Sequence, residues 1–383
     1  MSVKKIVLTG GPCAGKTSAQ KSLIEELEKT GYKVFFVQET ATELLNMGVN
    51  PDTLGGGTEG LYLFQKAIFE LQERKEEAIE RMAKTFPAEK KVVIYDRGLT
   101  DGKGFGGKEI YDKILYEENR NEFAVRDRYD AVFHLVTAAK GAEAFYGNST
   151  NEVRRENLEE ARIADEKIVS AWTGHPHLRV IGNNMRNFDK KIADLVKSVK
   201  NFLGEPVAKE IEKKYLIEYP DVDNLLRMPN CQKSTITQIY LKSEPGVDRR
   251  IRQREQGGYI TYTYTEKRPV EQSDGTFARY EDERQISVKE YNTLLKEADY
   301  RKHTIVKDRY NVVENEVTYE IDVYPFWNDR AIMEIELDDE NDIYTIPDFV
   351  SVVRDVTCEA AYKNTNLASN FEIDEPELEG RER

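Results

Sequence analysis

The spacing of apolar residues changes once along this 383-residue chain, and that change constrains the fold more than any other feature. Up to about residue 203, short apolar runs such as "KKIVLT", "KVVIYD" and "AVFHLV" alternate with long helical stretches. From about residue 209 onward, apolar and polar residues alternate with a period of two. The first pattern predicts an α/β domain, a parallel sheet with helices on both faces, and the second predicts an antiparallel β-domain.

The period-two region contains eight candidate strands, and "FLGEPVA" connects it to the first region. The strands are expected at 209–217, 236–242, 248–254, 259–267, 279–286, 302–310, 318–324 and 331–337. We therefore predict domains at 1–203 and 207–370, followed by a solvated acidic tail at 371–383.

The charge balance and the cysteine content limit the kinds of protein that this chain can be. The chain has 56 Lys and Arg against 70 Asp and Glu, a net charge of −14, which disfavours nucleic acid as a general partner. No apolar run approaches the ~18 residues of a membrane span, and the apolar start is too short for a signal peptide. The three cysteines lie far apart and show no metal-binding spacing. We expect reduced thiols and a cytoplasmic protein.

The stretch "GGPCAGKTS" fits the phosphate-binding pattern G-x-x-x-x-G-K-[ST] and stands between a predicted strand and a predicted helix. Backbone N–H groups of such a loop surround phosphate oxygens, while the lysine reaches the terminal phosphates and the threonine binds Mg²⁺. The predicted nucleotide-binding residues of this loop are Gly10, Gly11, Pro12, Cys13, Ala14, Gly15, Lys16, Thr17 and Ser18, with Thr17 also a metal ligand.

Further candidates stand at the ends of the next strands. Asp96 in "VVIYDRG" is placed to hold Mg²⁺, and the adjacent Arg97 to approach a phosphate. Glu39 in "VFFVQET" is placed to act as a general base, although capping of a strand end is the alternative for both acids. Three arginines on a predicted helix, Arg154, Arg155 and Arg162, form either a phosphate-closing lid or a solvated helix face.

These motifs resemble the nucleoside- and nucleotide-kinase branch of P-loop proteins, whose Asp/Glu-Arg-Ser element is similar to "DRG". Gly98 stands where that branch has serine, which leaves the acceptor open. The resemblance implies that ATP or GTP binds with Mg²⁺. The guanine signature NKxD is absent, although kinase-like P-loops bind guanine without it.

Charged residues alternate on single strand faces throughout the second region, for example in "EIEKKYL", "RIRQR", "RYEDE" and "MEIEL". One interpretation is a solvated sheet face with weak cross-strand ion pairs. The other is a closed barrel whose wet interior carries paired carboxylates for divalent cations and basic rows for polyphosphate. The segregation of arginines and of carboxylates into different strands favours the second.

The ordered set "EIEKKYL", "RIRQR", "TEK", "RYEDE", "VKDRY", "YEIDV", "MEIEL" and "AYKNTNLA" resembles the CYTH superfamily of triphosphate tunnel metalloenzymes. The resemblance implies an eight-stranded antiparallel tunnel that binds a linear triphosphate with Mg²⁺ or Mn²⁺. Metal-binding or water-activating roles are implied for Glu210, Glu212, Glu281, Glu283, Asp322, Glu334 and Glu336. Phosphate binding is implied for Lys214, Arg250, Arg252, Arg254, Lys267, Arg279, Lys307, Arg309 and Lys363.

The pairing of the two domains is also similar to the TRPL translocation defect protein family, which is associated with guanine-nucleotide and anionic-lipid binding. Three functions stay open on the sequence. The first is hydrolysis of tripolyphosphate or a nucleoside triphosphate in the tunnel, next to a P-loop kinase or NTPase domain. The second is a regulatory nucleotide-binding protein whose tunnel holds a phosphorylated ligand or lipid headgroup without turnover. The third is adenylate cyclase activity, which no residue selects.

Overall fold

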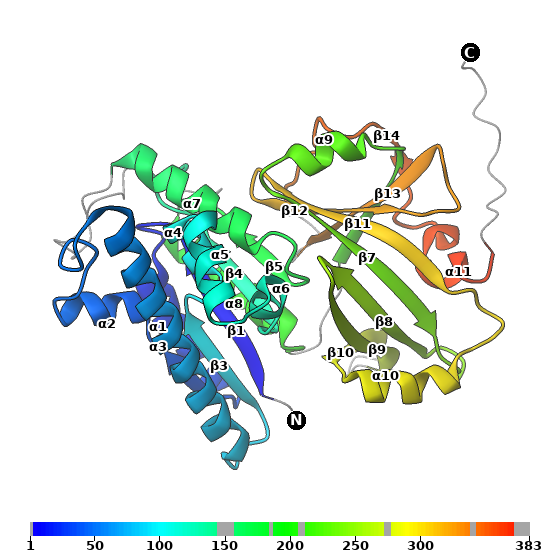
Figure 1. Cartoon of the computed structure of the whole chain (residues 1–383). Coiled ribbons are helices and arrows are strands. Elements are labelled where there is room, and N and C mark those ends of the chain that lie inside the picture. Colours follow the sequence, from blue (N-terminus) through cyan, green and yellow to red (C-terminus); the bar gives the residue numbers. More distant parts are fainter. Residues whose placement is uncertain are drawn as a thin grey trace. The chain divides into compact units, whose positions relative to one another are not determined.

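The structure is a computed structural model. It describes residues 3–143, 157–183, 187–205, 211–271, 277–337 and 342–370, with side chains left out at 269–271 and 277–280. The chain divides into two compact units (Figure 1). Unit 1 comprises Met1–Pro206, Arg227–Gln232 and Asn311–Thr318, and unit 2 comprises Val207–Leu226, Lys233–Tyr310 and Tyr319–Arg383. The domain limits given by the sequence stay predictions.

Unit 1 contains a five-stranded sheet in the order β2-β3-β1-β4-β5, and every pair of neighbours is parallel. Its strands are β1 (Lys4–Gly10), β2 (Lys33–Val37), β3 (Lys91–Asp96), β4 (Ala131–Leu135) and β5 (Leu178–Ile181). Its helices are α1 (Lys16–Lys29), α2 (Thr40–Asn46), α3 (Gly57–Thr85), α4 (Asp101–Gly106), α5 (Lys108–Glu117), α6 (Glu122–Arg126), α7 (Leu158–Trp172) and α8 (Phe188–Phe202).

Both faces of this sheet are buried under helices, as the continuous apolar runs predict. Ile6 and Leu8 of β1 pack in a cluster with residues of α1 and α8. Val7, which points to the other face, packs in a second cluster with residues of α3 and α7. The predicted parallel α/β architecture is confirmed, and it gathers the carboxyl ends of β1, β2 and β3 at one edge.

Unit 2 is built on a nine-stranded sheet in the order β10-β9-β8-β7-β11-β12-β13-β6-β14, curved rather than flat in Figure 1. Its strands are β6 (Ile211–Glu218), β7 (Cys231–Tyr240), β8 (Asp248–Gln256), β9 (Tyr259–Glu271), β10 (Phe277–Gln285), β11 (Ile305–Glu314), β12 (Val317–Val323), β13 (Arg330–Leu337) and β14 (Val352–Asp355). The pairings whose register is described in this sheet are antiparallel, as predicted.

The predicted count of eight strands is wrong. The ninth strand, β14, has four residues and pairs with β6 across an irregularity between Val352 and Arg354. So short a segment shows no alternation from which a strand could be recognised. The sheet order begins at β10 and ends at β14, and the strand pairings in the described ranges do not join these two strands.

Helices and turns complete unit 2. They are α9 (Val222–Arg227), α10 (Val288–Leu294), α11 (Asn364–Leu367) and the 3₁₀ turns Leu295–Glu297 and Ala360–Tyr362. Tyr291 and Leu294 of α10 pack against Ile251 and Tyr264, so this helix covers one face of β8 and β9. Across the described ranges of the chain, no helix combines the length and the apolar character needed to cross a membrane.

Candidate functional sites

The phosphate-binding loop of unit 1 runs from the end of β1 into α1, in the strand–loop–helix context that the motif requires. Gly15 precedes α1 with φ of 82°, and a Cβ on it would lie 2.3 Å from the Phe188 ring, so only glycine fits. Lys16 is 8% exposed at the first turn of the helix. The backbone N–H groups of this first turn have no carbonyl earlier in the helix and form a natural anion site.

The carbonyl groups of the loop are held from outside. Thr137 Oγ1 donates to the oxygen of Pro12 at 2.5 Å, and the backbone N–H of Ala138 donates to that of Cys13 at 3.3 Å. Lys191 Nζ donates to the oxygen of Ala14 at 3.2 Å. With its carbonyls turned toward these donors, the loop can present N–H groups to a phosphate.

Arg97 lies next to the loop and is 7% exposed, with a left-handed φ of 69° that is strained for a residue with a side chain. Its Nε donates to Glu39 Oε1 at 2.5 Å. Its Nη1 donates to the carbonyl oxygen of Gly10 at 2.9 Å and to Asp101 Oδ1 at 3.2 Å. The guanidinium lies 4.6 Å from the centre of the Phe105 ring. Arg97 therefore ties the ends of β1, β2 and β3 together.

The structure brings the two predicted acids of unit 1 to the same edge of the sheet. Burial would raise the pKa of Glu39, but Arg97 and Lys16 outweigh it and lower the pKa to about 2. So acidic a carboxyl group is a weak general base toward a hydroxyl. Asp96 ends β3, and its Oδ1 is buried with no hydrogen-bond partner in the part of the chain that is described. Such an oxygen suits a cation.

Only one of the three predicted lid arginines is described. Arg162 Nε donates to the carbonyl oxygen of Ala139 at 2.7 Å, and its Nη2 donates to Glu143 at 3.2 Å. Arg154 and Arg155 lie outside the described residues.

Sequence reasoning missed Asp165, a buried acid beside the phosphate loop. Its Oδ1 accepts from the backbone N–H of Gly11 at 3.0 Å and lies 2.9 Å from Nε2 of the buried His134. The available signal was its position on α7, one turn from Ala161 and Ile168 on the buried face. An acid on the apolar stripe of a helix indicates a specific partner.

In unit 2 many of the alternating charges on the strands are buried. Six of the predicted residues are between 0% and 9% exposed: Lys214, Lys267, Lys307, Arg309, Asp322 and Glu334. The residues that alternate with them on β12 and β13, such as Ile321 and Ile335, are also buried. Both faces of these strands are therefore covered, and the charged face is an interior one.

The charges on β6, β11, β12 and β13 form one group of ion pairs. Lys214 Nζ lies 2.6 Å from Glu334 Oε1, and Arg309 Nη2 lies 2.8 Å from Glu334 Oε2. Arg309 also donates to Asp322 Oδ1 at 2.7 Å, and Lys307 contacts the same carboxylate. Burial would raise the pKa of Glu334, but its three neighbouring cations, Lys214, Lys307 and Arg309, hold it well below the usual range.

A second group on β8, β9 and β10 is richer in cations than in acids. Lys267 Nζ lies 3.2 Å from Glu281 Oε2, and Arg250 Nη2 lies 3.8 Å from Glu281 Oε1. Arg252 Nη2 donates to Gln238 Oε1 at 3.3 Å, while its Nε is buried and has no hydrogen-bond partner among the described residues. Burial and repulsion from Arg250 lower the pKa of Arg252. The other predicted members are Arg254, which donates to Gln256, and Glu283, which accepts from Thr265.

The remaining predicted carboxylates, Glu212 and Glu336, form a row across β6, β13 and β12 together with Glu334 and with Glu320, which was not a predicted site residue. Glu212 lies opposite Glu336 in one pairing, and Glu320 lies opposite Glu334 in the next. Burial raises the pKa of Glu320, Arg309 acts against this, and repulsion from Glu336 and Glu334 adds to the rise. Within the described ranges, no three His, Cys, Asp or Glu side chains are grouped closely enough to hold a metal ion.

The predicted residues Glu210 and 371–383 lie outside the described residues, and Arg279 is described only by its backbone in β10. Lys363 is not brought to the ion pairs, since it is exposed between Tyr362 and α11. The interior face becomes apolar near this segment, where Leu216, Tyr240, Ile305, Tyr324 and Ile332 pack with Tyr362 and Leu367.

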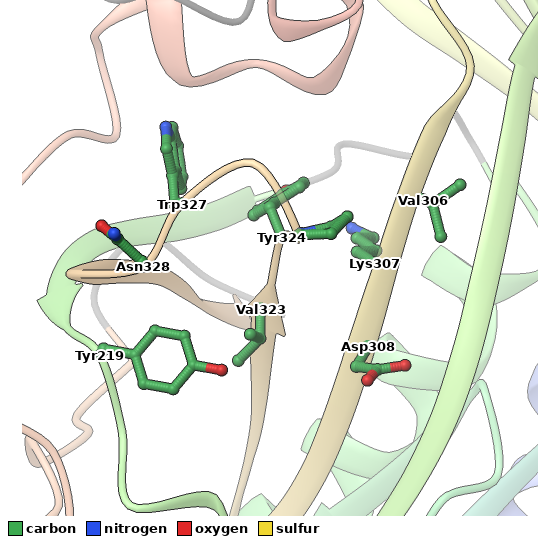
Figure 2. Close-up of a pocket in the computed structure, with 9 residues that line it drawn as sticks. Tyr219, Val306, Lys307, Asp308, Val323, Tyr324, Trp327 and Asn328 are labelled. Carbon is green, nitrogen blue, oxygen red and sulfur yellow. The ribbon is translucent and has the colours of Figure 1, made fainter.

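A pocket of about 340 Å³ lies where β11 and the segment after β12 separate (Figure 2). Figure 2 shows Tyr219, Trp327 and Asn328 on one side and Val306 and Asp308 on the other. Of the predicted site residues only Lys307 lines it, so the pocket is not the ion-pair interior itself.

Comparison with known proteins gives a family match within the first half of the sequence. Residues 5–186 match the family model described as an AAA domain, which supports a P-loop, nucleotide-binding type of domain in the first half. The match does not single out the kinase branch. No curated protein matches the chain.

Three solved structures are among those similar to this chain. The inorganic triphosphatase NE1496 is 24% identical over 42% of this chain and 95% of its own, with a TM-score of 0.28. PH1819 from Pyrococcus horikoshii OT3 is 21% identical over 34% of this chain and 81% of its own, with a TM-score of 0.26. HpAC1 from Hippeastrum, described as having a dominant triphosphatase activity, is 15% identical over 34% of this chain and 80% of its own, with a TM-score of 0.24. These TM-scores are below 0.5, so the chain's own strands and residues carry the fold and the site.

Proposed function

We propose that unit 2 is a CYTH-type tunnel domain that binds a linear triphosphate, either tripolyphosphate or a nucleoside triphosphate, and hydrolyses its terminal phosphoanhydride. The observation that carries this proposal is the burial of the charged strand face, with Lys307 and Asp322 at 1% and 0% exposure. Charges removed from water cost several kcal/mol each unless they are compensated. A solvated face with weak ion pairs would leave these side chains exposed.

The two groups of charges suit different parts of a triphosphate. The group on β8, β9 and β10 has the cations Arg250, Arg252, Arg254 and Lys267 against the acids Glu281 and Glu283. Its excess positive charge favours phosphate oxygens, which arginine binds through paired N–H groups. In the other group, Lys214 and Arg309 share Glu334, so this carboxylate already balances part of their positive charge.

The acidic row fits a divalent cation in its donor chemistry. Glu212 and Glu336 face each other across one strand pair, and Glu320 faces Glu334 across the next; burial raises the pKa of Glu320, and repulsion from Glu336 and Glu334 adds to the rise. Carboxylate oxygens are the ligands of Mg²⁺ and Mn²⁺, and a bound cation would neutralise phosphate charge and favour ionisation of a water molecule. Glu212, Glu281 and Glu283 are the acids proposed to orient that water, and Asp322, Glu334 and Glu336 to complete the ligand set with Glu210.

We further propose that unit 1 binds ATP or GTP with Mg²⁺ and either hydrolyses it or phosphorylates a small acceptor, as the kinase resemblance implies. Lys16 supplies the charge for the terminal phosphates, and Thr17 with the buried Asp96 Oδ1 suits the cation. Arg97 is engaged with Glu39 and Asp101, so in this role it shapes the site and neutralises Glu39.

Release of phosphate from tripolyphosphate by the full chain, with Mg²⁺ or Mn²⁺, tests the first proposal. The variant Glu212→Gln should lower turnover by about 100-fold or more, since it removes a proposed catalytic carboxylate. Asp282→Asn is a matched control, because Asp282 is exposed between Glu281 and Glu283 and faces the opposite way. Its turnover should equal that of the wild-type protein.

Two other results would change the assignment. Turnover that survives Glu212→Gln but is lost in Lys16→Ala would place the reaction in unit 1. Absence of turnover with tripolyphosphate, ATP and GTP, alongside tight binding, would instead support a regulatory protein of the kind that the TRPL resemblance implies. The ion pairs favour this second candidate, because Asp322 and Glu334 are already held by lysine and arginine. A phosphorylated ligand or lipid headgroup could replace these carboxylates as partners of the cations.

A further inference from the structure

Asp165 of α7 is buried, 1% exposed, and lies against the start of the phosphate loop. Its Oδ1 accepts from the backbone N–H of Gly11 at 3.0 Å and from that of Thr137 at 3.1 Å. The same oxygen lies 2.9 Å from His134 Nε2, and Lys140 Nζ lies 3.3 Å from Oδ2. One carboxylate thus connects four segments, namely the phosphate loop, β4, the loop after β4, and α7.

The environment keeps this carboxylate ionised. Burial would raise the pKa of Asp165, but His134, Lys140 and the N–H of Thr137 outweigh it and lower the pKa. An ionised carboxylate only accepts hydrogen bonds, so Nε2 of His134 carries the proton between them. Hydrogen bonds to a charged acceptor are shorter and stronger than neutral ones, which suits a group that must fix a backbone position.

Asp165 also explains why the second residue of the motif is glycine. A Cβ on Gly11 would lie 2.7 Å from Asp165 Oδ1 and 2.8 Å from its Cβ, closer than such atoms approach. The N–H of Gly11 is directed at Asp165, and this sets the direction in which the chain leaves β1. Asp165 also contacts the loop indirectly, through Thr137. Its Oδ1 accepts from the N–H of Thr137, and the hydroxyl of Thr137 donates to the carbonyl oxygen of Pro12.

Helix α7 is the element that carries the described lid arginine. Arg162 lies one turn before Asp165 and donates to the carbonyl oxygen of Ala139 at 2.7 Å. The helix is therefore fastened both to the loop after β4 and to the phosphate loop. A shift of α7 would act on the N–H of Gly11 directly.

We propose that Asp165 is a positioning residue that holds the phosphate loop in its nucleotide-binding form through Gly11 and thereby links α7 to the bound nucleotide. This inference rests on the proposed binding of ATP or GTP by unit 1. Asp165 itself contacts no phosphate.

A double-mutant cycle between Gly11 and Asp165 tests the role, with dissociation constants of Mg-ATP and Mg-GTP measured calorimetrically on the full chain. Gly11→Ala should weaken binding at least tenfold, because its methyl group displaces the loop from Asp165. Asp165→Ala should weaken binding by about tenfold, since the charge-assisted hydrogen bond that holds the N–H of Gly11 is lost. The double variant should bind no more weakly than either single variant, because the space left by Asp165 accepts the methyl group.

Two further variants separate positioning from a general structural role. Asp165→Asn keeps an acceptor for Gly11 and should recover most of the affinity that Asp165→Ala loses. Glu166→Gln removes the neighbouring carboxylate, which also contacts Lys140, at 3.4 Å, but lies 62% exposed. Its affinity should equal that of the wild-type protein.

The outcomes are distinguishable. If the wild-type protein binds nucleotide and the two single effects simply multiply, or if folded Asp165→Ala binds within twofold of wild type, the positioning role is wrong and the nucleotide site stands. If the wild-type protein binds neither nucleotide, the proposed function of unit 1 is wrong and the positioning role falls with it. Thermal unfolding of each variant shows which of them are folded when binding is measured.

Discussion

Buried carboxylates have different structural roles and different partners in the two units. In unit 1, Asp101 accepts from the backbone N–H of Gly98 at 2.9 Å, from Trp172 Nε1 at 3.2 Å and from the hydroxyl of Thr9, besides its pair with Arg97. In unit 2, Asp322 is held by the side chains of two cations. Acids of the first kind fix the backbone around a loop, whereas acids of the second kind neutralise charges.

This difference indicates which acids a ligand can replace. A phosphate oxygen offers lysine and arginine the same charge and acceptor geometry as a carboxylate. It cannot reach the backbone and indole N–H groups around Asp101, because these groups are enclosed in a packed core. We therefore expect added triphosphate to restore stability to a variant that lacks a buried acid in unit 2. We expect no such recovery for a variant that lacks a buried acid in unit 1.

The largest effect is expected for Asp322→Asn. Asp322 is 0% exposed, and its loss leaves Lys307 and Arg309 short of a buried counter-charge. Breaking such a pair from one side costs about 3–5 kcal/mol. The free energy of unfolding in urea measures the loss, first without and then with metal-free tripolyphosphate.

Tripolyphosphate should stabilise this variant more than it stabilises the wild-type protein. Ligand at 100 times its dissociation constant adds about 2.7 kcal/mol, so at one fixed tripolyphosphate concentration the protein that binds more tightly gains more stability, and the comparison is made at equal ligand concentration. A loss below about 1 kcal/mol would contradict the buried ion pair. Equal stabilisation of both proteins would contradict replacement of the carboxylate by phosphate.

Asp101→Asn is the matched change in unit 1 and should cost about 2–3 kcal/mol, because the amide keeps one acceptor oxygen but loses the charge that Arg97 faces. Asp101 is 3% exposed, so its burial is close to that of Asp322. Tripolyphosphate should add no more stability to this variant than to the wild-type protein, measured in the same urea titration. Selective rescue of Asp101→Asn would remove the distinction between the two kinds of acid.

The sequence predicts the phosphate loop and the inward direction of the alternating charges because both depend on short-range patterns. The alternation of residues along a strand indicates which face a side chain occupies, but not how deeply that side chain is buried. Glu334 and Glu336 share one face of β13, yet the first is 4% exposed and the second is exposed near the strand's end. The depth of a side chain depends on which strand lies opposite and on where that strand ends, and neither is encoded in the spacing of two residues.

The residues that the sequence did not reveal depend on distant partners. Asp165 and Gly11 are hydrogen-bonded although they lie 154 positions apart in the sequence, and no local pattern predicts such a pair. Lys363 was carried over from a family resemblance, and the structure leaves it exposed, directly after Tyr362 of an apolar cluster. A resemblance transfers residue types along a motif, whereas the contacts depend on how the last segment packs.

The smallest expected effect concerns Glu76, a fully buried acid of unit 1 whose Oε2 lies 3.7 Å from Arg128 Nε. Burial raises its pKa to about 7, although Arg128, Gln72 and Tyr129 act in the opposite direction. Since the folded state holds this proton above the usual carboxyl pKa of about 4.5, the stabilising contribution is complete below pH 4.5 and is lost as the pH rises through 7. The loss amounts to about 3 kcal/mol at most.

Replacing Glu76 by glutamine tests whether ionisation of this acid lowers the free energy of unfolding, as predicted. Glu76→Gln should flatten the dependence of unfolding free energy on pH between about 4.5 and 7, and at pH 8 it should be more stable than wild type by about 1–2 kcal/mol, since one amide N–H without an acceptor offsets part of the gain. Glu77→Gln, on the outer side of α3 beside Arg74, is the control and should leave the slope unchanged. The opposite result, a variant less stable than wild type at pH 8 with an unchanged slope, would mean that Glu76 is adequately paired, as Glu334 is in unit 2. Buried acids in the two units would then differ only in their partners and not in their ionisation.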